Sequence, residues 1–438
     1  MLPECRNEAD CFSIPEFSVE RKDIKKFMGE LRKSHSYFQD CFERKEPAEN
    51  FFRYMAGQFS DSERKSAEPI ATHVRGGTVR SMQRMLTDAV RKEDRIKQIY
   101  WGRLAQEMGT PDGIMTVDES GFPKKGNDSV GVARQYCSCP GKVGNSQVGV
   151  SAAYASPHGY ALADKRLFIP EKRFGDEYAV RRKKCGVPGK SEFGTEPQSA
   201  SEMIEEVTKA DILPFEYIVA DCLYGNSPEF IGAPDRYPEK IYFVSAPSDT
   251  QCRLQSPVVR TEEYRCRSET EIRQTVSEEP ISVSERAAAL NVHFRYKRKV
   301  SEGTEGPIVY EFAKREVTLA KNGLPWKRVW LLIKRTVGKE RMYSYYISNA
   351  PGSTRLKTFV WLSGIRWAIG QCFEETKTES GTDHYEVRKF SGWNHHILTC
   401  MSAHFFLRHL KIRLKKSTRA DTFSGQNSDK NSIASETV

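Results

Sequence analysis

Short apolar runs that end at polar residues recur through the middle of this 438-residue chain and constrain its fold more than any other feature. A stretch with helical character, Ser199 to Ala210, separates the earlier runs from the later ones. Strands mixed with crossover helices predict an α/β layer built on a mixed sheet. The runs are Gly113–Ser120, Gln147–Ala155, Gly159–Ile169, Phe215–Asp221 and Lys240–Ser245.

Two other features refine this sheet. The residues Ser156-Pro157-His158 separate two of the runs and predict a β-hairpin. From about residue 250 to 345 the chain is rich in Val, Thr, Tyr and Arg, in short alternating runs such as Arg328–Lys334. This alternating pattern predicts a β-rich insertion.

The N-terminal quarter carries a helical pattern. Charged residues alternate with apolar ones in Lys22–Arg32, and Ser81–Arg103 places apolar residues at helical spacing. The basic stretch Glu63–Arg75 lies between these two. Residues 20 to 110 are therefore expected to be helical, either as a solvated helical surface or as a DNA-contacting domain.

The C-terminal part is also expected to be helical, first over Arg366–Lys377. A long amphipathic helix follows, in which Ile397, Met401 and Phe405 repeat at four-residue steps. The tail from Lys415 to Val438 is rich in Ser, Thr, Asn and Lys and has no periodicity, so disorder is expected there.

The composition of the chain indicates which classes of binding partner to expect. The chain holds 68 Lys and Arg against 58 Asp and Glu, a formal net charge of +10, which favours a polyanion such as nucleic acid. The 11 cysteines include no CxxC pair, which argues for reduced thiols. No signal peptide and no apolar run long enough to span a membrane is evident, so we expect a cytoplasmic protein without a membrane partner.

Two aspartates stand where expected strands end, Asp118 in the first run and Asp221 in the fourth. Carboxylates at the ends of neighbouring strands can converge on divalent cations, and a pair of such ions can clamp the oxygens of a phosphoryl transfer. Aspartates at strand ends also often cap loops, so the pattern alone leaves both interpretations open.

Longer motifs carry a family resemblance. The segments VDESGFPKKGNDSVGVARQYCSCPGKVGNSQVGVSAAYA from Val117, ADCLYGNSPEF from Ala220 and RWAIGQCFEETKTESGTDHYEVRKFSGWNHHILTCMSAHFFL from Arg366 resemble the DDE-type transposases of bacterial insertion sequences. The segment GQFSDSERKSAEPIA from Gly57 resembles the N-terminal region of that family. The matches run in order from about residue 45 to 410.

The resemblance implies an RNase H-like catalytic domain with flanking helices, interrupted by a β-rich insertion. It divides the chain into an N-terminal helical DNA-binding region (1–110), a first catalytic part (111–250), the insertion (251–345), a last catalytic part (346–414) and a tail (415–438). It further implies two Mg²⁺ (or Mn²⁺) ions, and double-stranded DNA as partner, both as terminal inverted repeats and as target. A homodimer on DNA is consistent with this family.

Residue by residue, the resemblance makes Asp118 and Asp221 catalytic metal ligands, with Glu119 as a secondary acidic neighbour. It places Lys124 and Lys125 at DNA phosphate, where lysine acts as a point charge, although a solvated loop explains them as well. It also assigns DNA-binding roles to two basic residues of the last catalytic helix, Arg366 and Lys377.

The sequence departs from the family on that last helix. The family carries a catalytic Glu four residues after the Arg, often followed by a second Glu, but this chain has Gly370 and Gln371 there. Glycine offers no ligand atom. Glu374 lies one helical turn further on, about 6 Å along the axis, and is the candidate substitute.

Three functions remain open. The first is an active transposase whose third ligand has moved to Glu374. The second is a catalytically inactive DNA-binding relic, or a transposase reused to occupy terminal repeats. The third is a phosphohydrolase that acts on small substrates through Asp118 and Asp221. The missing carboxylate favours impaired DNA cleavage and strand transfer.

Overall fold

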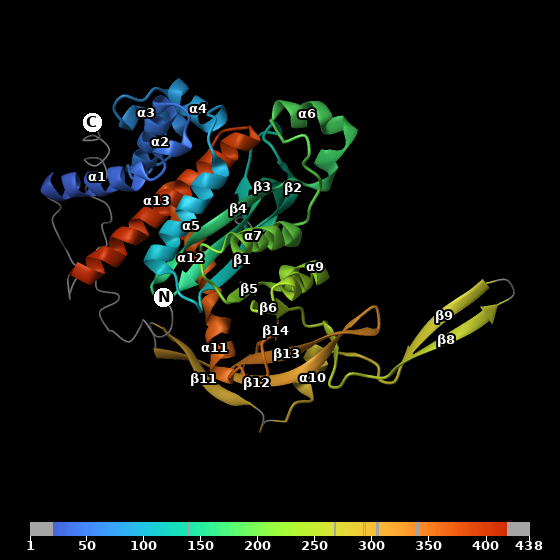
Figure 1. The fold of residues 1–438 in the computed structure, drawn as a ribbon. Helices are drawn as coiled ribbons and strands as arrows, with labels where there is room; N and C mark the ends of the chain where they lie inside the picture. The colour runs from blue at the N-terminus through green and yellow to red at the C-terminus, as the bar shows by residue number, and fades with distance from the viewer. Residues whose placement is uncertain are drawn as a thin grey trace. The chain divides into compact units, whose positions relative to one another are not determined.

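The computed structural model describes residues 21–138, 141–266, 269–291, 293, 295–303, 306–338 and 341–417. These residues form two compact units. The first unit runs up to Phe215 and resumes at Trp367, and the second comprises Glu216–Arg366. Figure 1 shows the elements of both, and each unit is described separately below.

Helices form the N-terminal part of the first unit, as expected. The predicted helical stretch Ser81–Arg103 is instead two helices, because the chain leaves the helix after Thr87 and starts a new one at Glu93. The first of these two begins with a capping box between Thr78 and Ser81. The elements are α1 (Arg21–Ser36), a 3₁₀ turn (Gln39–Cys41), α2 (Lys45–Gly57), α3 (Ala67–His73), α4 (Val79–Thr87) and α5 (Glu93–Met108).

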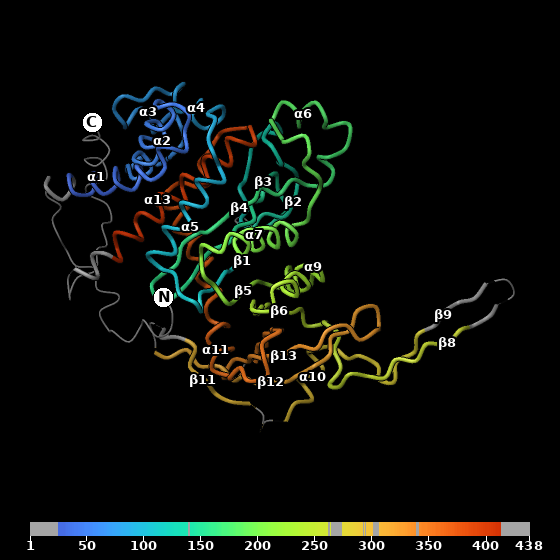
Figure 2. Tube along the Cα trace, in the orientation of Figure 1, coloured from blue at the N-terminus to red at the C-terminus, as the bar shows by residue number. Residues whose placement is uncertain are grey.

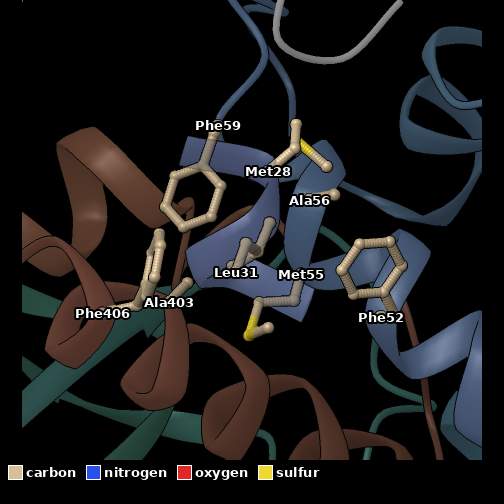
Figure 3. Close-up of a cluster of buried hydrophobic side chains, with 8 residues drawn as sticks. All are labelled: Met28, Leu31, Phe52, Met55, Ala56, Phe59, Ala403 and Phe406. Atoms are coloured by element: carbon tan, nitrogen blue, oxygen red, sulfur yellow. The ribbon is translucent and has the colours of Figure 1, made fainter. Parts of the chain in front are cut away.

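These helices share a core with the last helix of the chain. Figure 3 shows Phe59 of the N-terminal part packed close to Ala403 and Phe406 of α13 (Phe390–Ser417). The Phe59 and Phe406 rings lie 5.9 Å apart, and α5 runs beside α13 (Figure 2). The predicted helix is present, but residues 392–406 are buried on every side, so it is not amphipathic there. Ala403 and Phe406 pack against α1 and α2, whereas Phe405 of the predicted stripe packs edge-on against Tyr100 of α5 at 5.6 Å.

The sheet of the first unit is antiparallel. Its longest strand, β3 (Lys142–Ser156), pairs with β1 (Ile114–Pro123), β2 (Ala133–Cys137) and β4 (Gly159–Phe168). The predicted hairpin is confirmed, since Ser156 pairs with Gly159 across a two-residue turn. Helices α7 (Glu196–Ala210), α12 (Trp367–Ser380) and α13 flank these strands, and a short helix α6 (Ala179–Lys184) precedes α7.

The second unit contains the predicted β-rich region and two strands that precede it. β5 (Tyr217–Ala220) and β6 (Ile241–Ala246) are parallel, and β6 continues antiparallel into β14 (Tyr343–Ser348). The insertion therefore extends the same sheet. Its other strands are β7 (Gln251–Arg253), β10 (Ile281–Ser282), β11 (Tyr296–Gly303), β12 (Gly306–Lys321) and β13 (Leu324–Thr336).

Short elements complete the second unit. β8 (Val259–Cys266) and β9 (Glu269–Val276) form a separate two-stranded hairpin. The helices are α8 (Cys222–Gly225), α9 (Pro228–Gly232), α10 (Val283–Ala288) and α11 (Leu356–Ile365), with a 3₁₀ turn at Ala233–Arg236. The chain is thus a mixed α/β protein with a large mixed sheet and flanking helices.

Two further expectations concern the ends of the chain and its surroundings. The predicted tail begins at Lys415, but residues 415–417 continue α13, and 418–438 lie outside the described residues. Within the part of the chain that the structure describes, no helix combines the length and the apolar character needed to cross a bilayer.

Candidate functional site

Asp118 lies in the middle of β1, where the sequence led us to expect the end of a strand. It pairs with Ser151, and the ladder to β3 continues for five more residues to Pro123. The prediction of a strand end is therefore wrong. The acidic pair Asp118-Glu119 interrupts the apolar pattern, but the chain beyond it stays extended because β3 still offers backbone partners.

The Asp118 side chain points to the face of β1 that helix α12 covers. Side chains alternate along a strand, so Asp118 shares its face with Phe122 and Glu119 takes the opposite one. The Lys377 ammonium of α12 lies 5.8 Å from the centre of the Phe122 ring, and the Tyr385 ring lies at the same distance. The Glu119 backbone N–H donates to Oδ1 of Asp118 at 3.0 Å, and a carboxylate oxygen of Glu119 still lies within 4.8 Å of one from Asp118.

Helix α12 runs in the same direction as β1. At its start, the Trp367 ring packs edge-on against Tyr160 of β4 at 5.7 Å. Tyr160 pairs with Ala155 of β3, and Ala155 pairs with Ile114, the first residue of β1, so this contact lies at the beginning of β1. At its end, Lys377 reaches Phe122 near the end of β1. The stretch of α12 between these two contacts, which holds Gly370, therefore spans the level of Asp118.

Gly370 presents an open position on this helix. It is exposed, and a Cβ added to it would meet no atom within 4 Å. Seven residues make almost two full turns, so Gly370 and Lys377 share one side of α12. Glu374 is exposed one turn after Gly370, whereas Gln371 is half-buried. A side chain could therefore begin at position 370 without its Cβ displacing a neighbour.

A buried polar cluster fixes the rotation of α12, and sequence reasoning missed it. Oε1 of Glu375 accepts from the Tyr160 hydroxyl at 2.8 Å, and its Oε2 bonds Nε2 of His404 at 2.8 Å and a guanidinium N–H of Arg408. Burial alone would raise the pKa of Glu375, but the His404 and Tyr160 hydrogen bonds and the Arg408 charge lower it to about 2. The signal available in the sequence was the acidic pair Glu374-Glu375, whose members lie about 100° apart on a helix.

In the second unit, Asp221 directly follows strand β5, as predicted. It is the N-cap of the short helix α8, and its Oδ1 accepts from the Leu223 backbone N–H at 2.9 Å. Its Oδ2 lies 3.4 Å from a guanidinium nitrogen of Arg366. Asp221 is thus the loop-capping aspartate that its position indicated, and its carboxylate is held in a defined orientation.

Arg366 does not belong to the helix that carries Gly370. It is the C-cap of α11, and α12 begins at the next residue, Trp367. The expectation of one helix from Arg366 to Lys377 is wrong at its first residue. Arg366 keeps helical dihedral angles, with φ −55° and ψ −27°, so local preference alone could not reveal the break.

The two adjacent lysines after β1 differ. Nζ of Lys124 donates to the Tyr385 carbonyl at 3.0 Å and lies 3.4 Å from the centre of the Tyr385 ring. Burial lowers the pKa of Lys124 to about 8. Lys125 is exposed. The ammonium of Lys124 is therefore engaged with Tyr385 within the protein, whereas the ammonium of Lys125 can contact an external phosphate.

The side chains best suited to hard divalent cations are three half-buried carboxylates, Asp118 and Glu119 on β1 and Asp221 after β5. Carboxylate oxygens are the ligands that Mg²⁺ prefers, and this ion usually keeps water ligands or takes substrate phosphate oxygens beside them. Their chemistry therefore fits Mg²⁺ or Mn²⁺.

Comparison with known families gives one match. The sequence pattern of a family described as DDE superfamily endonuclease matches residues 37–307, more than half of the chain. The match includes Asp118 and Asp221 and ends before α11 and α12, so it does not extend to position 370. A comparison with curated proteins found none that matches the chain.

Proposed function

The chain belongs to the DDE superfamily endonucleases, and from that membership we propose that it binds the ends of a mobile DNA element but cleaves them poorly, because Gly370 withholds a carboxylate. Double-stranded DNA is the substrate that the family implies. The terminal inverted repeats, the target DNA and a homodimer assembled on them are parts of the proposal.

Asp118 and Asp221 are proposed to hold two Mg²⁺ or Mn²⁺ ions, with Glu119 as a secondary ligand. When bound, such ions supply charge stabilisation to the attacking and leaving oxygens of an in-line displacement. Asp118 contributes a carboxylate from a paired strand. Asp221 contributes one whose direction the Leu223 N–H and the Arg366 guanidinium set.

The proposed impairment rests on one observation: Gly370 is exposed on the side of α12 that bears Lys377, along the stretch that spans the level of Asp118. A glutamate at this position would project toward the face of β1 that carries Asp118. Glycine leaves only backbone and open space there. Asp118 and Asp221, with Glu119 as a secondary ligand, would then have to hold the ions without the third carboxylate that the family carries on this helix.

Glu374 is the competing third ligand. It lies on the same side of α12, one turn later, and is exposed. Metal-ligand distances tolerate errors of only about 0.2 Å, so a ligand displaced by about 6 Å along the helix requires a local rearrangement. Because Glu375 fixes the rotation of α12, such a rearrangement would also disturb its partly buried ion pair with Arg408.

The basic residues near the carboxylates are proposed to bind DNA phosphate. Lys125 is exposed just after β1, and Lys377 lies on the side of α12 that faces β1. Arg366 would orient the Asp221 carboxylate and bind a DNA phosphate at the same time. Lysine and arginine contacts to phosphate set position along DNA without reading its sequence.

A strand-cleavage assay tests this proposal. The substrate is supercoiled plasmid that carries the DNA flanking the gene, with Mg²⁺ or Mn²⁺. We expect little nicking by the unmodified protein and at least a tenfold increase for Gly370→Glu, about 1.4 kcal/mol of transition-state stabilisation. Asp118→Asn in the Gly370→Glu background should abolish the gain.

Two matched variants control this experiment. Gln371→Glu adds the same carboxylate about 100° away around the helix and should not increase nicking. Glu374→Ala should have no effect. Robust nicking by the unmodified protein that Glu374→Ala abolishes would refute the proposed impairment and make Glu374 the third ligand.

A further inference from the structure

One edge of the sheet in the second unit is strongly basic. β11 begins with Tyr296, and the run Arg295–Lys299 reads RYKRK, four basic residues in five with no acid. Among the described strands β11 pairs with β12 alone, so β11 is an edge strand. The Tyr296 side chain is 47% exposed, which is unusual for a ring of its size in a folded sheet.

The strand register shows which side chains share a face with Tyr296. Arg298 lies on the same face two residues later, opposite Tyr310 of β12. Phe312 pairs with both Tyr296 and Lys334, which brings Lys334 of β13 to this face. Cations and aromatic rings therefore lie beside one another on three neighbouring strands, around the fully buried Phe312.

Lys334 lacks a counter-charge. Its ammonium lies 4.0 Å from the centre of the Tyr310 ring, and none of the carboxylates in the described residues forms an ion pair with it. Burial lowers the pKa of Lys334. A half-buried cation without an anionic partner is unfavourable, so this position suits an anion that comes from outside the chain.

The same face leads to Asp221. Tyr346 of β14 pairs with Leu332 of β13, two residues before Lys334, so its side chain lies on this face. Burial raises the pKa of Tyr346, whereas the Ser344 hydrogen bond and the Arg366 charge lower it. Arg366 in turn lies 3.4 Å from the Asp221 carboxylate. All of these residues belong to the second unit, and together they connect the β11 edge with the aspartate.

We propose that this face, the cation–tyrosine face, binds one unpaired DNA strand that leads away from the phosphate beside Asp221. It comprises Arg366, Tyr346, Lys334, Tyr310, Arg298 and Tyr296. This inference rests on the proposed function, because it takes the nucleic acid at Asp221 as given. Neighbouring rings and cations favour an unpaired strand, since bases stack on the rings while cations meet the phosphates. A duplex would offer the phosphates alone.

Fluorescence anisotropy with a labelled 12-nucleotide single strand, in EDTA, tests the assignment. Stacking contributes about 1–3 kcal/mol per base, so Tyr296→Ala should weaken binding by about fivefold or more. Tyr296→Phe keeps the ring and should bind as the unmodified protein does. Lys334→Gln should weaken binding and lower the salt slope by about 0.7, the value for one single-strand phosphate.

Arg328→Gln provides the matched control. Arg328 lies on the same strand as Lys334, but it is exposed and paired with Glu316 at 2.6 Å, so its removal should leave binding unchanged. Unchanged binding in Tyr296→Ala and Lys334→Gln, with thermal melting showing folded protein, would overturn the inference. So would an equal loss for a blunt duplex, which would indicate phosphate contact without stacking. The anisotropy assay needs neither metal nor cleavage. Failure of this inference can therefore be distinguished from failure of the proposed function, which the plasmid nicking assay tests.

Discussion

The two units hold their aspartates in different ways. Asp118 sits in the middle of a ten-residue strand, under a helix whose rotation a buried ion pair fixes. Asp221 caps a four-residue helix through one backbone N–H and one arginine contact. The first arrangement depends on buried charges and the second on a few replaceable contacts. We therefore expect the first unit to be sensitive to changes in charge and the second to tolerate them.

The histidines show the same contrast. Only one of the nine, His293, lies in the second unit, and it is exposed. In the first unit His396 is fully buried and bonds the Tyr54 hydroxyl through Nδ1 at 2.9 Å. His395 is buried beside Glu93 at 3.0 Å. Proton uptake by these buried rings should therefore affect the first unit far more than the second.

Among single substitutions, the largest effect is expected from the loss of the ion pair that fixes α12. Glu375→Gln leaves Arg408 without its counter-charge and should lower the free energy of unfolding by about 3 kcal/mol. Glu374→Gln is the matched control, because Glu374 is exposed and its replacement should stay within about 0.5 kcal/mol. Urea midpoints measure both. Equal small effects would mean that α12 is not held by Glu375.

Acid should loosen the first unit next. Burial lowers the pKa of His395 to about 4 and that of His396 to about 3, from the usual 6.5. The folded state thus binds fewer protons below pH 6.5 than the unfolded state. Stability is complete above that pH and falls toward pH 4, by about 2 kcal/mol per histidine at pH 5.

Hydrogen exchange at pH 7 and pH 5, corrected for intrinsic rates, measures this difference. Peptides from α13 should lose protection at the lower pH, whereas peptides from β12 and β13 should keep theirs. Equal loss in both regions would show that the buried histidines do not distinguish the units.

A smaller effect is expected at Asp221. Asp221→Ala removes the cap of α8 and should cost about 1 kcal/mol of unfolding free energy. Asp221→Ser restores a capping oxygen without a metal-binding carboxylate. It should keep the stability of the unmodified protein, yet abolish the nicking gained by Gly370→Glu. A serine variant that still nicks would remove Asp221 from the proposed metal site.

The smallest effect on stability is expected at Lys125, where the readout is DNA binding. Lys125→Gln should reduce the log–log salt slope of duplex binding by about 0.9, the value for one phosphate, and leave the melting temperature unchanged. Lys124→Gln should instead lower the melting temperature and leave the salt slope unchanged, because Nζ of Lys124 is engaged with Tyr385. If both variants lower the slope equally, both lysines contact phosphate.

Local pattern was sufficient for several elements. The hairpin at Pro157–His158, the strand before Asp221 and the repeat of α13 were all visible because each depends on neighbouring residues. The local sequence pattern gave wrong element boundaries where contacts with a distant segment of the chain set them. Partners on β3 carry β1 past Asp118, and the helices α4 and α5 are separate although their apolar spacing reads as one.

By itself the sequence determined that the chain is an α/β protein with a β-rich insertion, that two aspartates stand on or after its strands, and that glycine occupies position 370. Tertiary structure decided what surrounds those residues. Glu375 turns inward to Arg408 while Glu374 stays exposed, and Lys124 is occupied by Tyr385 while Lys125 is exposed. The physical reason is that a side chain's role depends on burial and counter-charge, and segments far apart in the chain supply both.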